Sequence, residues 1–422
     1  MLLILLFRSF FFRFIELSIM YKLLILTLVA LATAQKASYE NYQVFSVLPS
    51  TESQLEILRQ IEEHDGIVNN YMNMTVDVMV APNKLAEFFD LMNALGTSYT
   101  KFIDNVQYLI DSEMPKEELA SFAGFSFNTY HTIDEIYSYL DSLAEHYSNN
   151  VQIIVGGTSY ERRQIKGVKL SFGKQKPGIV IEGGIHAREW ISPATVLYII
   201  DRLLNSPNSE VRKLAEGHDW YIFPSVNPDG YAYTHTKNRL WRKTRKPYSF
   251  FCYGSDPNRN WGYRWNTGGS SSNACSETHA GSSAFSEIET KSLSEYLKSI
   301  SDKFFAYISF HSYSQLLLFP YGHTKDHLEN YNDLSINALA KRYGTSYRTG
   351  NIAETIYIAT GSSVDWVKAV LHKSVSYTYE LRDTGRYGFL LPASQIVPTG
   401  EETLDSIIAL FKEAAVQIQS YL

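Results

Sequence analysis

Residues 179–190 constrain the fold and the chemistry of this chain more than any other stretch. They begin as a short apolar run, which predicts a buried strand, and they break at two glycines. His186 and Glu189 follow, just before an apolar-periodic segment that predicts a helix. In open α/β sheets, ligands bind at the edge where strands end and helices begin. An imidazole and a carboxylate at this edge are a candidate pair of zinc ligands, although most pairs with this spacing are surface residues or satisfied polar contacts.

Apolar strands alternate with helical patterns from residue 130 onward. The helical signals include capping boxes that begin at Thr132 and Ser286 and a last helix over residues 401–420. This alternation predicts an α/β domain in which a mixed, largely parallel sheet is sandwiched by helices. The predicted strands cover residues 151–155, 166–172, 179–185, 220–226, 304–310 and 374–379.

Two more of these strands end in ionisable residues, at His311 and Glu380. If the strands are parallel neighbours, both residues meet His186 and Glu189 at one edge of the sheet. Two histidines and a glutamate bind zinc and leave a fourth position open, which is the arrangement of catalytic zinc sites. Glu380 is then the candidate general base. The alternative for Glu380 is a structural ion pair with the nearby Arg382.

The chain before residue 111 predicts a small α+β module. Its strands and helices occur in the order β-α-β-β-α-β, which is the pattern of a ferredoxin-like sandwich. A stretch with a proline and an acidic run follows the module. We therefore expect a module at residues 35–110, a linker at residues 111–127 and a second domain at residues 128–422. The predicted strands of the module cover residues 42–48, 67–71, 76–80 and 100–110.

Residues 1–34 predict a secretory signal, so we expect a secreted, extracellular protein. A basic residue, an apolar run and an Ala-x-Ala site follow Met20 and end at Ala34. Residues 1–19 are apolar as well, but their charged residues interrupt any run long enough to span a bilayer. Met20 is therefore a candidate for the true start, and we expect no membrane-spanning segment.

Cys252 and Cys275 are the only cysteines of the chain. In an oxidising compartment we expect them to form a disulfide, and the alternative is a pair of buried free thiols. The net charge of −6 gives no sign of the basic surface that binds nucleic acid. We therefore expect no nucleic acid among the partners.

Five motifs, in order along the chain, match one family of enzymes. They are Gly184-Ile185-His186-Ala187-Arg188-Glu189-Trp190, Asn238-Arg239-Leu240-Trp241-Arg242, Asp256-Pro257-Asn258-Arg259-Asn260-Trp261, Phe310-His311-Ser312-Tyr313-Ser314-Gln315 and Tyr379-Glu380-Leu381-Arg382-Asp383. Through them the chain resembles the zinc metallocarboxypeptidases of the carboxypeptidase A/B type, in their secreted proenzyme form. The resemblance covers nearly everything after the signal region. It implies that the small module is an inhibitory pro-domain and that residues 111–127 are an activation linker.

The resemblance also implies roles for the residues at the sheet edge. His186, Glu189 and His311 would bind one zinc ion, a ligand set for which this family is an established example. Glu380 would act as the general base, and Arg242 would stabilise the negative charge that develops on the scissile carbonyl group. Without the resemblance, Arg242 would be interpreted as part of a solvated basic cluster.

Other residues match those that hold the end of a peptide substrate in this family. Asn258 and Arg259 would bind the terminal carboxylate, because a guanidinium group matches a carboxylate in shape. Tyr357 would close over the substrate. The outer subsites are matched by Arg188, Tyr313 and Phe389.

The pocket for the terminal side chain of the substrate follows from the same resemblance. Val364 occupies the position where B-type enzymes carry an aspartate that pairs with a terminal Lys or Arg. With Val364, Ile352 and Ile356 there, we expect A-type specificity for aromatic or aliphatic terminal residues. Ser362 departs from the A-type pattern, in which glycine is usual. The matched pocket positions are Ser309, Leu318, Gly322, Ile352, Ile356, Ala359, Ser362, Val364 and Thr378.

We expect three features of the working protein from this resemblance: peptide or protein C-termini as substrates, an activating endopeptidase that cuts the linker, and a monomer. Lys116 is the candidate cut, and the two cysteines match the disulfide of the family. The alternative function is a catalytically silent homologue that binds peptide C-termini. Loss of a zinc ligand or of the base would favour it, and none is lost. A structural or adhesive extracellular protein would be expected to have repeats or more disulfides, and the chain has neither.

Overall fold

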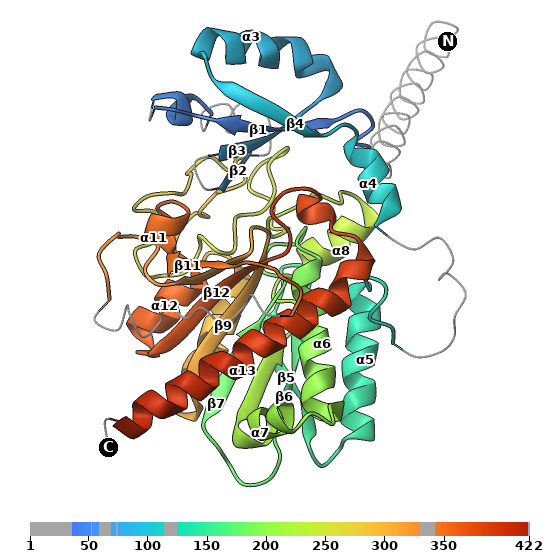
Figure 1. Cartoon of the computed structure of the whole chain (residues 1–422), viewed down its shortest axis with the longest axis vertical. Helices are drawn as coiled ribbons and strands as arrows, with labels where there is room; N and C mark the ends of the chain where they lie inside the picture. Colours follow the sequence, from blue (N-terminus) through green and yellow to red (C-terminus); the bar gives the residue numbers. More distant parts are fainter. Residues whose placement is uncertain are drawn as a thin grey trace, which may run out of the picture.

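The computed structural model of the chain describes residues 36–51, 53–58, 69–72, 75–113, 125–328 and 342–420. They form a small amino-terminal module and a larger domain, and the module packs against one end of the larger domain (Figure 1). The predicted signal region and most of the expected linker lie outside the described residues. Among the described helices, none combines the length and the apolar character needed to cross a bilayer.

The small module is an antiparallel sheet in the order β2-β3-β1-β4, which is the order of a ferredoxin-like sandwich. Phe45 and Val78 lie on one face of this sheet and pack against Phe88 and Met92 of helix α3. The opposite face turns toward the larger domain (Figure 1). The elements are β1 (Gln43–Leu48), β2 (Asn69–Met72), β3 (Thr75–Val80), α3 (Leu85–Leu95) and β4 (Ser98–Ile103).

The last strand of the module is shorter than the sequence suggested. Our prediction of a strand over residues 100–110 is wrong beyond Ile103, because helix α4 (Val106–Ser112) follows. Asn105 caps this helix by accepting a hydrogen bond from the backbone N–H of Gln107. Helix α4 therefore continues into the first residues of the expected linker.

The larger domain is built on an eight-stranded mixed sheet in the order β11-β10-β12-β9-β7-β8-β6-β5. The four central strands, β12-β9-β7-β8, are parallel, and antiparallel strands join them on both sides. The predicted α/β class with a mixed, largely parallel sheet is confirmed, although β10 and β11 were not predicted. The strands are β5 (Val151–Thr158), β6 (Gln164–Leu170), β7 (Gly178–Glu182), β8 (Asp219–Phe223), β9 (Phe304–Ser312), β10 (Leu316–Phe319), β11 (Arg348–Asn351) and β12 (Val375–Leu381).

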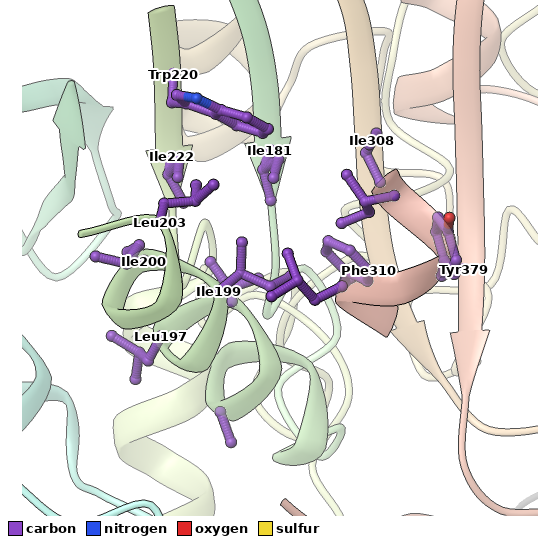
Figure 2. Close-up of a cluster of buried hydrophobic side chains, with 14 of the residues drawn as sticks. Ile181, Leu197, Ile199, Ile200, Leu203, Trp220, Ile222, Ile308, Phe310 and Tyr379 are labelled. Carbon is purple, nitrogen blue, oxygen red and sulfur yellow. The ribbon is translucent and has the colours of Figure 1, made fainter. Parts of the chain in front are cut away.

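Helices cover both faces of this sheet. Helices α5, α6, α7 and α13 pack on one face, and α9 and α12 pack on the other. Figure 2 shows the first face, where Ile181, Ile222 and Ile308 of the strands meet Ile199 and Leu203 of α6. Burial on both faces explains why the central strands appear in the sequence as continuous apolar runs. The helices are α5 (Ile133–His146), α6 (Ile191–Asn205), α7 (Ser209–Gly217), α8 (Pro228–Thr236), α9 (Ile288–Ser299), α11 (Ile352–Thr355), α12 (Ser363–Val370) and α13 (Ile396–Ser420).

Of the two capping boxes predicted in this domain, the structure confirms one and contradicts the other. The box at Thr132 is present, and its side chain accepts a hydrogen bond from the backbone N–H of Glu135. The box at Ser286 is wrong, because α9 begins at Ile288 without a side-chain cap. The Ser286 hydroxyl instead accepts a hydrogen bond from the side chain of Asn260.

The described part of the chain resumes at Phe125, which packs against the larger domain. The Phe125 ring stacks on His131 and on Tyr139, with 3.9 Å between the ring centroids in each pair. Such stacking adds to the burial of the ring. The expected linker is therefore flanked by two ordered points of the chain, helix α4 and Phe125.

Candidate active site

His186 and Glu189 lie in the turn that joins β7 to α6. The turn begins just after β7 and includes Gly184, whose φ is +61°. This left-handed conformation favours glycine, and a Cβ at this position would also approach the backbone of Ser225 at 3.1 Å. The sharp break that the two glycines predicted therefore sets the direction in which both side chains leave the strand.

His311 on β9 and Glu380 on β12 reach the same edge of the sheet. The two strands are parallel, and these two residues pair directly in their register. Strand β9 is also the parallel neighbour of β7. The structure thus brings His186, Glu189, His311 and Glu380 together around one cleft.

Three of these side chains form a buried cluster that fits a metal ion. Nδ1 of His186 lies 2.8 Å from Oε1 of Glu189 and 3.1 Å from Nδ1 of His311. Nδ1 of His311 lies 3.2 Å from Oε2 of Glu189. A tetrahedral zinc ion with bonds of about 2.0–2.1 Å holds its ligand atoms about 3.3 Å apart. Both the donor types and their spacing therefore fit zinc.

Asp256 is a functional residue to which the sequence analysis assigned no role. Its Oδ1 lies 3.0 Å from Nε2 of His186, and its Oδ2 accepts a hydrogen bond of 2.7 Å from Arg242. A carboxylate at the far ring nitrogen fixes the tautomer of a metal-binding histidine and orients its ring. The motif that contains Asp256 was visible in the sequence, but the contact with His186 joins positions 70 residues apart.

The charges of the cluster shift the pKa values of the carboxyl groups. Burial acts to raise the pKa of Glu189, but His186 and His311 lower it by more, so its pKa lies below the usual range. The pKa of Asp256 lies well below its usual value, because Arg242 and His186 outweigh the effect of burial. Both carboxylates are therefore ionised, as a cation site requires. Burial raises the pKa of Glu380 to about 8, and His311 offsets part of that effect, so this carboxyl exchanges a proton close to neutral pH.

Hydrogen-bond donors line the cleft next to this cluster. Asn258 accepts a hydrogen bond of 3.0 Å from the backbone N–H of Ser363 through Oδ1, and its donor Nδ2 lies 3.4 Å from Nε2 of His311. Arg259 donates to the Tyr357 hydroxyl at 3.3 Å. Together with Arg242, these groups make a cationic wall that suits a carboxylate.

The cleft encloses about 710 Å³, including its open mouth. Its apolar lining residues include Ile352 and Val364, which belong to one buried hydrophobic cluster, and Ile356, which packs against that cluster. Leu318, Ala359, Ser362 and Thr378 also line the cleft, as the resemblance implied. Two positions matched to the pocket, Ser309 and Gly322, are not among the lining residues.

The three residues matched to outer subsites form a contiguous group at the rim. The guanidinium of Arg188 lies 4.2 Å from the ring centroid of Phe389, and the Tyr313 ring packs edge-on against Phe389 at 4.9 Å. Tyr313 and Phe389 line the cleft, whereas Arg188 lines a second pocket beneath the small module. Glu277 forms an ion pair with Arg188 at 3.2 Å and helps to hold it there.

The small module contacts this rim through buried polar side chains. Asp77 of β3 accepts a hydrogen bond of 2.7 Å from the Tyr313 hydroxyl. Glu113, directly after α4, uses both carboxylate oxygens to pair with Arg239. Arg239 also stacks on the ring of Trp190, 3.7 Å from its centroid. The module therefore covers the outer part of the cleft.

Cys252 and Cys275 form the predicted disulfide. Neither cysteine lines the cleft. The bond crosslinks the loop-rich region between α8 and α9, which also carries Asn258 and Arg259. The disulfide therefore restrains the region that supplies the carboxylate-binding side chains.

The fold and the site together define a class of protein: a zinc-dependent hydrolase with a His₂Glu metal cluster, an adjacent carboxylate and a carboxylate-binding wall. The model of the zinc carboxypeptidase family matches residues 136–406, and that of the carboxypeptidase activation peptide matches residues 45–113. The chain belongs to the zinc carboxypeptidase family, and it carries the activation peptide of a precursor. Its cofactor is zinc.

Known proteins similar to this chain include both A-type and B-type names. The chain is 48% identical over 403 residues to zinc carboxypeptidase A 1 of Anopheles gambiae, and the match covers 92% of this chain and 93% of the relative. It is 44% identical over 288 residues to carboxypeptidase B of Astacus astacus, and this match covers 66% of this chain and 95% of the relative. The crystal structure of thrombin activatable fibrinolysis inhibitor is similar with a TM-score of 0.81 and 34% identity, over 88% of this chain and 98% of that one.

Proposed function

We propose that this chain is a secreted, monomeric precursor whose larger domain removes aromatic or aliphatic residues from the C-termini of peptides and proteins. One observation carries the proposal. A zinc-fitting cluster, a carboxylate and a carboxylate-binding wall line a single cleft that also has apolar lining residues.

Each group of the cluster has a distinct role in this proposal. His186, Glu189 and His311 hold the zinc ion, which when bound supplies a Lewis acid that polarises a carbonyl group and activates water. Glu380 takes up a proton at its carboxylate and returns it to the leaving amine. Arg242 is fixed in place by Asp256 and stabilises the negative charge that develops on the carbonyl oxygen.

Recognition of a free C-terminus is the task of Asn258, Arg259 and Tyr357. The guanidinium of Arg259 and the amide Nδ2 of Asn258 donate to the terminal carboxylate, and the Tyr357 hydroxyl lies beside them. An internal peptide bond offers no carboxylate to these donors, so it forgoes the charge-assisted hydrogen bonds that a free C-terminus makes. This difference favours an exopeptidase over an endopeptidase.

The chemistry of the pocket decides between A-type and B-type specificity, because relatives with both names match the chain. Val364, Ile352 and Ile356 offer no carboxylate to a terminal Lys or Arg, whose burial without a partner costs several kcal/mol. An aromatic or aliphatic side chain gains ~1.5–3 kcal/mol from burial there. The nearby carboxylate of Asp365 is not among the residues that line the cleft, and it accepts a hydrogen bond from the backbone N–H of Gly322.

Latency follows from the position of the module. With residues 35–110 as the inhibitory module and residues 111–127 as the linker, a long peptide cannot reach the rim while Asp77 holds Tyr313. An activating endopeptidase that cuts the linker would free the cleft, and Lys116 is the candidate cut.

A single assay tests the proposal. Full-length chain from the culture medium is given a blocked peptide ending in Phe, before and after limited trypsin treatment, with and without a zinc chelator. We expect release of Phe only after the cut, and loss of that release with the chelator until zinc is restored. A cut, zinc-loaded chain that binds the peptide and releases nothing would instead identify a silent homologue.

A further inference from the structure

One buried residue contacts the backbone of every segment that carries a zinc ligand. Ser192 lies in the first turn of α6 and has no exposed surface. Its backbone N–H donates to the carbonyl oxygen of Glu189 at 3.0 Å. Its hydroxyl accepts a hydrogen bond of 2.9 Å from the N–H of Gly184 and donates one of 2.6 Å to the carbonyl oxygen of Phe310. Gly184 is two residues from His186, and Phe310 directly precedes His311.

The hydroxyl of Ser192 links the chain segments that continue from β7 and β9 beyond the last backbone pairing of the two strands. The ladder between β7 and β9 ends with the pair Glu182 and Ser309. Both histidines lie beyond this last pair. The hydroxyl of Ser192 therefore connects the turn that carries His186 to the end of β9 that carries His311, with its single proton and one of its lone pairs.

We propose that Ser192 is a positioning residue for the zinc site. Its hydroxyl sets the separation between the turn with His186 and Glu189 and the strand with His311. Alanine in its place would leave the N–H of Gly184 and the carbonyl of Phe310 buried without this partner. The 3.1 Å spacing of the two histidine nitrogens would then no longer be fixed in advance of metal binding. Substitutions of groups that orient metal ligands weaken metal affinity by about 10–100-fold.

The same helix provides a matched control. Thr195 also has no exposed surface, and its hydroxyl has no hydrogen-bond partner among the described residues. Thr195→Val removes a buried hydroxyl from α6 with almost no change of shape. Ser192→Ala removes a buried hydroxyl one turn earlier, and the two variants differ in whether that hydroxyl bridges the ligand-bearing segments.

The experiment measures zinc binding by the full-length chain and does not depend on substrate. Zinc affinity is measured by competition with a chromogenic chelator, and Tm is measured for the zinc-free and zinc-loaded chain. We expect Ser192→Ala to weaken zinc affinity about 10–100-fold and to shrink the rise in Tm that zinc produces. Ser192→Thr keeps the hydroxyl and should stay close to the unmodified chain, as should Thr195→Val.

Two results would overturn the proposal. One is a zinc affinity of Ser192→Ala equal to that of Thr195→Val. The other is an equal fall in Tm of the zinc-free and zinc-loaded forms with unchanged affinity, which would show that the hydroxyl stabilises the fold alone. If Ser192→Ala does not fold, Ser192→Cys replaces it, because a thiol is a weak donor and acceptor. An affinity of Ser192→Cys equal to that of Ser192→Thr would then reject the role.

Discussion

Glu113 and Arg239 form a buried ion pair across the boundary between the module and the larger domain, with Oε1 of Glu113 2.5 Å from Nη2 of Arg239. The side chains are 1% and 2% exposed, so neither charge can be compensated by water. Arg239 also donates to the backbone of Arg188 and Phe389 at the rim of the cleft. The pair thus connects the residue directly after α4, in the expected linker, to the outer part of the site.

Glu113→Ala should weaken latency. Removing one partner of a buried pair leaves an uncompensated charge and costs about 3–5 kcal/mol. The free energy that holds the module against the larger domain would fall by that amount. We expect the uncut variant to hydrolyse a long peptide measurably, whereas the uncut original chain does not. Asp104→Ala is the control, because Asp104 forms an exposed pair with Lys101 within the module. Equal latency of the two variants would contradict the role of Glu113.

Glu380→Gln should separate zinc binding from turnover. The amide cannot accept the proton, so we expect kcat to fall by ~10²–10⁴-fold or more while the zinc content stays near one ion per chain. His311→Ala should instead lower the zinc content itself, because it removes a ligand. Metal analysis of both purified variants, alongside their activity after the cut, checks the assignment. Retained turnover in Glu380→Gln would refute the role of the base.

Val364→Asp should move the specificity toward basic residues. A carboxylate in the pocket would pair with a terminal guanidinium and would lose favourable burial of a terminal ring. The measurement is the ratio of kcat/KM for two blocked peptides that differ only in terminal Phe or Arg. We expect the original chain to prefer Phe and the variant to shift the ratio toward Arg. A preference of the original chain for Arg would show that the pocket was assigned wrongly.

Glu289→Gln should stabilise the fold in a pH-dependent way. Burial raises the pKa of Glu289 to about 7 from an ordinary value of 4.5, and its Oε2 has no hydrogen-bond partner among the described residues. The pKa is higher in the folded state than in the unfolded state, so the folded state binds the proton more tightly. This adds to the free energy of unfolding in full below pH 4.5, and the contribution is lost as the pH rises through 7. Glutamine stays neutral throughout. We therefore expect the variant to be more stable by about 3 kcal/mol at pH 8 and by roughly 1 kcal/mol at pH 5.

Urea unfolding at the two pH values measures this difference. Thr290→Ser, at the next position on α9, serves as a control that leaves the carboxyl group in place. A gain in stability that is the same at pH 5 and pH 8 would show that ionisation of Glu289 is not its cause.

The sequence predicted the central strands because burial on both faces makes them continuous apolar runs. Strands β10 and β11 were not predicted, for two different reasons. Residues Leu316–Phe319 are four buried apolar residues, too few to separate a strand from other buried segments. Residues Arg348–Asn351 have no apolar pattern at all, and their strand conformation comes from pairing with β10.

The sequence predicted those residues of the candidate site that lie in recognisable motifs. The zinc-fitting cluster consists of such residues, either in the turn directly after a predicted strand (His186 and Glu189) or at the end of one (His311). Asp256 and Ser192 could not be assigned in this way. Their roles depend on contacts between segments far apart in the chain, and serine and aspartate are common residues that have no distinctive sequence pattern in such roles.

The contacts of Glu113 and of Phe125 with the larger domain have a kinetic consequence. A protease that cuts between Glu113 and Phe125 breaks a peptide bond, but it leaves the Glu113–Arg239 pair and the stacking of Phe125 on His131 and Tyr139 in place. Scission and activation are therefore separate events with separate rate constants. The second is a dissociation whose rate does not depend on the amount of protease, and a severed module can rebind. Activity should consequently lag behind the appearance of cut chain, and diluting the reaction should raise the final fraction of active enzyme.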